Sequence, residues 1–462
     1  MTEFDTYLSP FTWRYGSPEM RRIWSEEHKR LLWRQIWVTL AQVQSEWGLV
    51  SPEQIDDITK HATTLDIPRA LQIEAEIHHD LMAELSTFAQ QCPIGGGILH
   101  LGATSMDIED NADALRLRQS VDLIRVKLAA ILRQFAVKIE QWADLPIMAF
   151  THLQPAEPST LGYRFSLYAQ DLLEDWNNLS FIRRNLSGKG FKGAVGTSAA
   201  YADLISVDQL AVFESRLSES LGLPFYPIAS QVYPRKQDYT LLCALAGIGA
   251  SLSKFALDIR ILQSPPVGEW AEPFGEKQVG SSAMPFKRNP IQSEKIGSLA
   301  RVLAQMPRTA WDNASNSILE RTLDDSANRR IILPEAFLVT DELLSVATRL
   351  ITKMQINLNA INNTLNIYAP FAATEHILMA LAKAGADRQE MHAVLRQHAL
   401  TAWQAVQTGM PNPLKDLICQ DAMITSYIPA VTLVGLLDIT RHTGDAPQRA
   451  RKFAQTILTA IG

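Results

Sequence analysis

Apolar residues recur along the chain in steps of three and four, which is the spacing of one face of an α-helix. Three such runs are long, extending over residues 117–142, 161–179 and 241–262. A repeat sustained over so many turns predicts long helices that pack together along their whole length, as in a multi-helix bundle that also oligomerises. Alternating strand patterns are scarce, and at most a short ribbon is expected near residues 187–194.

Glycine and proline gather between these runs and predict the loops. The interruptions are residues 93–97, 188–196, 223–234, 265–290 and 410–413. We therefore expect an all-α fold of three helical domains. These are an N-terminal helical domain (residues 1–107), a central long-helix bundle (108–360) and a C-terminal helical domain (361–462).

Composition narrows the class of protein. The 462 residues carry a formal net charge of −6, and 47% of them are hydrophobic. The absence of a basic excess argues against nonspecific binding of nucleic acid. Residues 1–10 lack the apolar core of a signal peptide, and the apolar stretch near residues 241–250 is too short to span a bilayer. We therefore expect neither a nucleic-acid nor a membrane partner.

The cysteines and histidines indicate the compartment and the absence of a metal. Cys92, Cys243 and Cys419 lie far apart and fit neither a disulfide framework nor a metal-binding pattern, which favours a reduced, cytoplasmic setting. His78 and His79 are adjacent, so they point in different directions on a helix and lack the spacing of a helical zinc site. We expect no metal and no cofactor.

Four polar stretches are not explained by helix packing. They are residues 100–111, 151–155, 280–290 and 320–330. The third reads Gly280-Ser-Ser-x-Met-Pro-x-Lys-x-Asn-Pro290, which is the long and specific signature of the fumarase/aspartase superfamily. Within it the chain resembles the adenylosuccinate lyase family over nearly its whole length, with further matching stretches at residues 9–15, 192–197, 370–376 and 384–389.

The resemblance implies a β-elimination in purine nucleotide biosynthesis. Fumarate would leave adenylosuccinate to give AMP, and would leave SAICAR, the succinylated imidazole carboxamide intermediate, to give AICAR. The resemblance also implies a homotetramer, with the central bundle as its core and with each active site shared by loops of three subunits. The partners expected are therefore the succinylated nucleotide, the two products and other copies of the chain.

The chemistry explains why these residue types are needed. Removing a proton next to a carboxylate adds a second negative charge, so the site must hold cations and N–H donors where that charge develops. The resemblance assigns the base to Ser281, whose hydroxyl can act only if its oxyanion is stabilised, for example by backbone N–H groups of the Gly-Ser-Ser turn. It assigns the acid to His152, oriented by Glu294, and adds Lys287 and His79 to the catalytic group.

The resemblance also implies a substrate-binding set. Lys287 and Asn289 would bind the substrate carboxylates, with hydrogen bonds from Thr104, Ser105 and Thr151. A phosphate would be held by arginine forks and hydroxyl groups, which suit a dianion. The full set of expected contacts is Arg14, Tyr15, His78, Asp80, His100, Thr104, Ser105, Thr151, Gln231, Ser282, Met284, Asn289, Arg321, Ser326 and Arg330.

Two alternative interpretations share the fold. Argininosuccinate lyase or a carboxymuconate-type cycloisomerase would carry the same signature but would need no phosphate pocket, so Arg14-Tyr15 and residues 321–330 disfavour them. A non-catalytic, crystallin-like scaffold would be expected to have lost Ser281, His152 or Lys287. All three are present.

Overall fold

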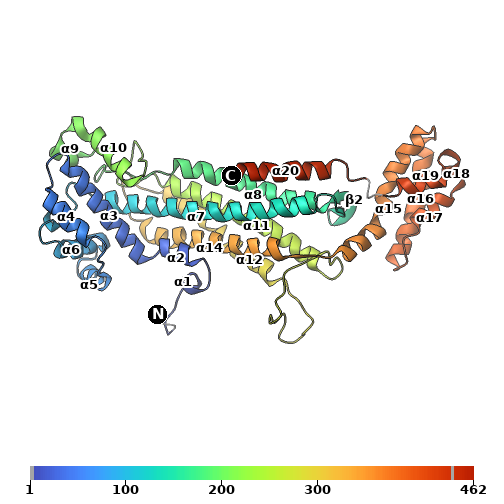
Figure 1. The fold of residues 1–462 in the computed structure, drawn as a ribbon, viewed down its shortest axis with the longest axis horizontal. Helices are drawn as coiled ribbons and strands as arrows, with labels where there is room; N and C mark the ends of the chain where they lie inside the picture. Colours follow the sequence, from blue (N-terminus) through green and yellow to red (C-terminus); the bar gives the residue numbers. More distant parts are fainter. Residues whose placement is uncertain (1–4, 439–441) are drawn as a thin grey trace. The chain divides into compact units, whose positions relative to one another are not determined.

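Nearly all regular secondary structure in the described chain is helical, which confirms the expected all-α class (Figure 1). The structure, a computed structural model, describes residues 5–438 and 442–462. The strands are short and pair in twos, β1 (Pro146–Thr151) with β2 (Gln154–Thr160) and β3 (Trp270–Ala271) with β4 (Gln355–Ile356).

The chain divides into two compact units. Unit 1 consists of Met1–Leu128, Asp175–Ala250 and Ser298–Ser345, and unit 2 of Ala129–Glu174, Ser251–Gly297 and Val346–Gly462. The expected division into three domains at residues 107 and 360 stays a prediction.

Each helix belongs to unit 1, to unit 2 or to both. Unit 1 holds α1 (Pro10–Trp13), α2 (Pro18–Ile23), α3 (Glu26–Ser45), α4 (Pro52–His61), α5 (Ile67–Ile77), α6 (Asp80–Gln91), η1 (Gly96–Ile98), α9 (Ala199–Ile205), η2 (Val207–Gln209), α10 (Leu210–Leu221) and α13 (Met306–Ser315). The helices with residues in both units are α7 (Ser105–Gln141), α8 (Leu161–Asn185), α11 (Lys236–Gln263), α12 (Ile291–Leu303) and α14 (Ser326–Lys353). Unit 2 also holds α15 (Leu358–Lys383), α16 (Arg388–Gln407), α17 (Leu414–Gln420), α18 (Ala422–Tyr427), α19 (Ala430–Leu436) and α20 (Ala446–Ile461).

The three long periodic runs form α7, α8 and α11, as predicted. Their repeating apolar residues face the interior: Leu117, Phe165 and Leu245 are fully buried. In unit 2 these faces meet in an aromatic core, where the Phe135 and Phe255 ring centroids lie 5.2 Å apart and those of Phe165 and Trp270 lie 5.1 Å apart. Aromatic packing of this kind adds to the free energy gained by burying apolar area.

Unit 1 contains a buried ion cluster that fixes its first helices. Arg30 and Arg34 of α3 both bind Glu84 of α6, at 2.7 and 2.6 Å, and all three side chains are almost fully buried. Paired charges of this kind avoid the cost of an isolated buried ion. The contacts hold α6, and with it Asp80 at its first position, in a defined place.

Helix α11 corrects one sequence-based expectation. The apolar stretch near residues 241–250 belongs to a helix of 28 residues, which by length and composition alone is long enough to cross a membrane. Half of its most apolar window is buried inside the protein, and Leu241, Leu245 and Leu252 are fully buried. A helix that is apolar around much of its circumference is also expected in the core of a large protein.

The predicted ribbon at residues 187–194 was wrong. That segment is irregular apart from one isolated bridge between Gly188 and Phe225. Its polar groups bond to a helix instead of a strand: Asp107 of α7 accepts a 2.5 Å bond from Lys189 Nζ and bonds from the backbone N–H groups of Lys192 and Gly193. The longer of the two ribbons is the β1–β2 hairpin at residues 146–160, which sequence reasoning missed.

Candidate active site

The β1–β2 hairpin presents His152 at its tip. Thr151 pairs with Gln154, so His152 and Leu153 form a two-residue turn, and both have left-handed backbone with φ of 54° and 59°. Positive φ at both central residues defines a type I′ turn, which normally uses Asn and Gly. Thr151 and His152 are exposed to solvent. The turn therefore aims the imidazole outward at the cost of backbone strain, a cost often found at functional sites.

The strain at the tip can be relieved without touching His152. Asparagine tolerates left-handed backbone better than leucine, so Leu153→Asn is expected to raise the free energy of unfolding by about 1 kcal/mol. Denaturant titration measures this change. The matched control is Leu71→Asn on α5, where an exposed leucine occupies an ordinary helical position and asparagine should destabilise. If Leu153→Asn lowered the free energy of unfolding, the claim that the left-handed backbone at Leu153 is strained would be wrong.

The signature segment, residues 280–290, forms a loop that leads into α12. Ser281 Oγ accepts hydrogen bonds from the backbone N–H groups of Ala283 at 3.3 Å and Met284 at 3.1 Å. These donors belong to the two residues that follow the Gly-Ser-Ser turn, and not to the turn residues from which the sequence led us to expect them. Two N–H dipoles directed at one oxygen favour negative charge on it.

The two ends of the same loop are joined by a hydrogen bond. The Asn289 side-chain amide donates to the carbonyl of Gly280 at 3.0 Å, and a Cβ on Gly280 would collide with the carbonyl oxygen of Lys287. Gly280 is therefore required by close backbone approach. Ser282, Met284 and Lys287 are exposed on this loop, which Figure 1 shows extending away from the neighbouring helices of unit 2.

The expected partner of His152 is not in contact with it. Glu294 lies in the first turn of α12 and is exposed. Among the described residues of the chain, none forms a hydrogen bond or ion pair with the His152 side chain. The role of Glu294 in orienting His152 stays a prediction.

A second group of candidates surrounds the first turn of α7 in unit 1. His79 caps the start of α6, and its Nε2 lies 3.3 Å from the hydroxyl of Ser105, the first residue of α7. The backbone N–H of Thr104 binds Asp107 at 3.1 Å. The N-terminus of a long helix attracts anions through its unpaired N–H groups and its dipole. The arrangement suits a carboxylate.

His100 is held in one tautomer. Its backbone is left-handed with φ of 68°, and the indole N–H of Trp37 donates to His100 Nδ1 at 3.0 Å. The neutral ring must then carry its proton on Nε2. Burial lowers the pKa of His100, which favours this neutral form.

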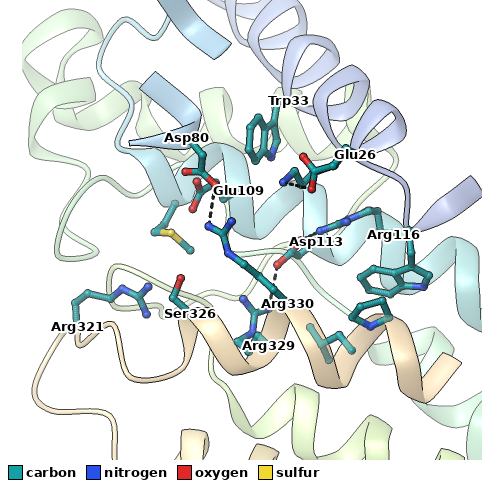
Figure 2. A pocket seen from close by; sticks show the side chains of 15 residues that line it. Glu26, Trp33, Asp80, Glu109, Asp113, Arg116, Arg321, Ser326, Arg329 and Arg330 are labelled. Carbon is teal, nitrogen blue, oxygen red and sulfur yellow. Dashed lines mark hydrogen bonds and ion pairs between the residues drawn. The ribbon is translucent and has the colours of Figure 1, made fainter. Parts of the chain in front are cut away.

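A cavity of about 140 Å³ lies in unit 1 beside α3, α6, α7 and the start of α14. Figure 2 shows its lining, which contains four of the expected residues: Asp80, Arg321, Ser326 and Arg330. Ser326 is the first residue of α14, and Arg321 precedes it in the adjoining turn. A helix N-terminus with a hydroxyl and two guanidinium groups is a suitable site for a phosphate.

The charged groups of the cavity are closely paired. Arg330 donates to Asp80 at 2.8 Å, Arg321 to Asp325 at 2.7 Å and Lys29 to Glu26 at 2.7 Å. Burial raises the pKa of Asp80, but the Arg330 charge and hydrogen bond outweigh it and leave the pKa below its usual value. The Asp80 carboxyl group is therefore ionised at neutral pH, and its pairing with Arg330 is maintained.

A buried network positions the arginine segment. Arg235 binds Asp325 at 2.5 Å and Asp110 at 3.1 Å, and Asp325 in turn holds Arg321. Arg329 binds Asp238 at 2.8 Å. Because these ions are buried, removing one partner leaves another charge unpaired, at a cost of roughly 3–5 kcal/mol. The network therefore fixes Arg321 and the beginning of α14.

Several expected contacts do not line this cavity. Arg14 and Tyr15 follow α1 in a segment anchored to α14, where Ser17 N–H donates to Asp341 at 2.6 Å. His78 is the exposed left-handed cap of α5. Gln231 is joined to residues 320–330 through its backbone N–H, which donates to the carbonyl of Glu320 at 3.2 Å. Their roles in binding substrate stay predictions.

Sequence reasoning missed other residues that line the cavity. They are charged or aromatic side chains on helix faces, namely Glu26, Lys29, Trp33, Glu109, Asp113, Arg116 and Arg329. A detectable signal was present on α7, where acidic residues at 107, 109, 110 and 113 crowd the first turns of the helix. Such crowding is costly unless cations compensate it.

Comparisons with known proteins agree on one kind of enzyme. A family model described as Lyase matches residues 27–304, and one described as Adenylosuccinate lyase C-terminus matches residues 370–453. The chain is 38% identical to the adenylosuccinate lyase of Saccharomyces cerevisiae, covering 98% of this chain and 95% of that protein. It is 39% identical to that of Schistosoma mansoni, covering 99% and 96%.

A solved structure supports the fold. The 3-carboxy-cis,cis-muconate lactonizing enzyme from Pseudomonas putida superposes with a TM-score of 0.85 at 23% identity, over 97% of this chain and 99% of that chain. At this identity the likeness extends to the fold alone.

Proposed function

Since the chain belongs to the adenylosuccinate lyase family, we propose that it eliminates fumarate from adenylosuccinate to give AMP, and from SAICAR to give AICAR. The observation that carries this proposal is the 38% sequence identity to an enzyme of that name over 98% of this chain. The Ser281 hydroxyl, which accepts hydrogen bonds from two backbone N–H groups, is consistent with it. The expected setting is the cytoplasm, with no metal or cofactor involved.

Ser281 removes the proton in this proposal. Its oxyanion, stabilised by the N–H groups of Ala283 and Met284, takes a proton from the succinyl carbon next to a carboxylate. The electrons of that C–H bond form the new C=C bond, and those of the C–N bond move to the nitrogen. Lys287 supplies positive charge near the carboxylates, and the loop amides supply directed donors.

His152 returns a proton to the leaving nitrogen. An imidazole can donate near neutral pH without a large pKa shift. The hairpin tip gives it the exposure needed to reach a ligand. Glu294 would fix its tautomer when the two are brought together by substrate or by another subunit.

The unit 1 residues bind the rest of the substrate. The first turn of α7, with Thr104, Ser105 and His79, takes a carboxylate, and the cavity with Arg321, Ser326 and Arg330 takes the phosphate end. A homotetramer with shared sites would supply the remaining contacts. Two exposed apolar side chains, Phe286 on the signature loop at 84% and Val279 just before it at 77%, are suited to burial against another subunit.

A spectrophotometric assay tests the reaction. Conversion of adenylosuccinate to AMP is expected to proceed with loss of the substrate's absorbance, and SAICAR should also be cleaved. Argininosuccinate and a carboxymuconate serve as alternative substrates. Turnover of either one, without turnover of the succinylated purines, would overturn the proposal in favour of another enzyme of this fold.

Arg330 provides a prediction specific to the phosphate. Arg330→Gln removes a charge-assisted fork, worth about 1.5–3 kcal/mol, so KM for adenylosuccinate is expected to rise about 10- to 100-fold with a smaller change in kcat. Steady-state kinetics measure both constants. Arg349→Gln, an exposed position further along α14, is the matched control and should leave KM unchanged. An unchanged KM in Arg330→Gln would remove Arg330 from the phosphate site.

A further inference from the structure

Among the described residues that line the cavity, Glu109 is the one with an ionisable side chain for which the structure gives no hydrogen bond or ion pair. It lies on α7 one turn before Asp113. The other cavity acids have partners: Asp80 binds Arg330, Glu26 binds Lys29, and Asp113 binds Arg116 and Arg329. Figure 2 shows Glu109 beside the Asp80–Arg330 pair, so that two carboxyl groups face one guanidinium already in use.

The charges around Glu109 disfavour its ionised form. Three acids act on it, Asp80 from α6 and Asp110 and Asp113 from α7, and Arg330 from α14 is the cation that opposes them. Lys29 on α3 is engaged by Glu26 at the cavity wall. Burial, followed by these acids, raises the pKa of Glu109 to about 8. The Glu109 carboxyl group, which has no hydrogen-bond or ion-pair partner, therefore stays protonated at neutral pH because it is buried next to other acids.

We propose that Glu109 must carry its proton for a nucleotide phosphate to occupy this cavity, which makes nucleotide binding take up a proton above neutral pH. This inference rests on the proposed function, because it assumes that the phosphate binds at Arg321, Ser326 and Arg330. In this cavity Asp80, Glu26 and Asp113 are each paired with a cation, so an ionised Glu109 would be the acid whose charge directly opposes a dianionic phosphate. The neutral carboxyl group does not repel the phosphate and can donate a hydrogen bond to it through its O–H. The carboxylate would repel the phosphate and could not donate a hydrogen bond.

The sign follows from linkage. Below pH 8 Glu109 is mostly protonated in the free protein, so nucleotide binding requires little proton uptake at this group. Above pH 8 the free protein loses the proton and the complex regains it from solvent, so affinity falls as pH rises, by up to about tenfold per pH unit. AMP is a suitable probe because its phosphate, with a pKa of about 6, stays a dianion over this range.

The experiment measures AMP binding to the full-length protein by calorimetry from pH 7 to pH 9, in two buffers that differ in ionisation enthalpy. For the unsubstituted chain the Kd is expected to rise about tenfold between pH 7 and pH 9, with uptake of about one proton at pH 9. Glu109→Gln replaces the neutral acid by a neutral amide. It should bind AMP at pH 7 within about threefold of the unsubstituted chain, and its Kd should stay nearly constant to pH 9. Glu53→Gln, an exposed position on α4, should keep the full pH dependence.

Each other outcome overturns a defined claim. If Glu109→Gln keeps the same pH dependence and proton uptake, or if the unsubstituted chain shows none, the role of Glu109 is wrong while the proposed function stands. If the unsubstituted chain fails to bind AMP at pH 7, the proposed function itself is wrong and the inference fails with it. Circular dichroism establishes whether Glu109→Gln is folded. A purely structural defect would lower AMP affinity equally at every pH, whereas loss of the titrating group removes the pH dependence.

Discussion

Ser281→Ala is expected to lower kcat for adenylosuccinate by about 10³-fold, with little change in KM. Loss of a positioned general base typically costs 10²- to 10⁴-fold, and the backbone N–H groups of Ala283 and Met284 would then face a methyl group with no oxyanion to stabilise. The remaining contacts to substrate come from other residues, so ground-state binding should persist. Steady-state kinetics on both succinylated purines check the expectation.

The matched control for Ser281 is Ser298→Ala, an exposed position on α12 that should retain full activity. Binding of AMP to Ser281→Ala should remain within a few-fold of the unsubstituted protein, which would separate loss of the base from collapse of the loop. Retention of more than about a tenth of kcat would mean that another group removes the proton.

Mixing two inactive variants is expected to restore activity. If His152 and Ser281 reach a site from different subunits, random hybrid tetramers of His152→Ala and Ser281→Ala should contain both intact residues in about a quarter of their sites. Each variant alone has none. Co-expression with two affinity tags, followed by tandem purification, isolates the hybrids for assay.

Two controls define the hybrid experiment. Tetramers that carry His152→Ala on both tagged chains should be inactive, and hybrids of either variant with the unsubstituted chain should retain activity. Hybrids without activity above that of the parents would place both residues on the same subunit at each site. A single tagged species of monomer mass would contradict the tetramer itself.

The long helices could be predicted because their apolar repeat reflects burial directly. Leu117, Leu245 and Leu252 are each at a periodic position and fully buried, and local sequence alone determines that pattern. The α11 helix shows the limit of such reasoning. Its periodic run predicts residues 241–262 and the helix spans Lys236–Gln263, but the apolar stretch was placed at residues 241–250 and judged too short to span a bilayer.

The β1–β2 hairpin could not be predicted, because it breaks the usual signals. Its second strand contains Pro155 and Pro158, and its turn is formed by His152 and Leu153 instead of Asn and Gly. Proline is acceptable there because a two-stranded ribbon leaves every strand with a free edge. The turn adopts a conformation that its residues disfavour, which local propensity cannot anticipate.

Only some of the candidate site residues could be recognised in the sequence, for a related reason. The loop serine and the residues near the start of α14 stand in unusual polar strings, so they were visible in the sequence. Glu109, Lys29 and Arg116 lie on helices, where charged residues usually form solvated pairs of little consequence. Only the fold shows that these faces enclose a cavity.

The bond from the Asn289 amide to the Gly280 carbonyl turns the signature segment into a closed ring. The bond restrains the segment before any ligand arrives, so less conformational entropy is lost when substrate binds than an unrestrained loop would lose. If Ser281 is the base that we propose, its oxygen is positioned during folding, and the segment would enter a shared site already formed instead of being assembled there by the substrate.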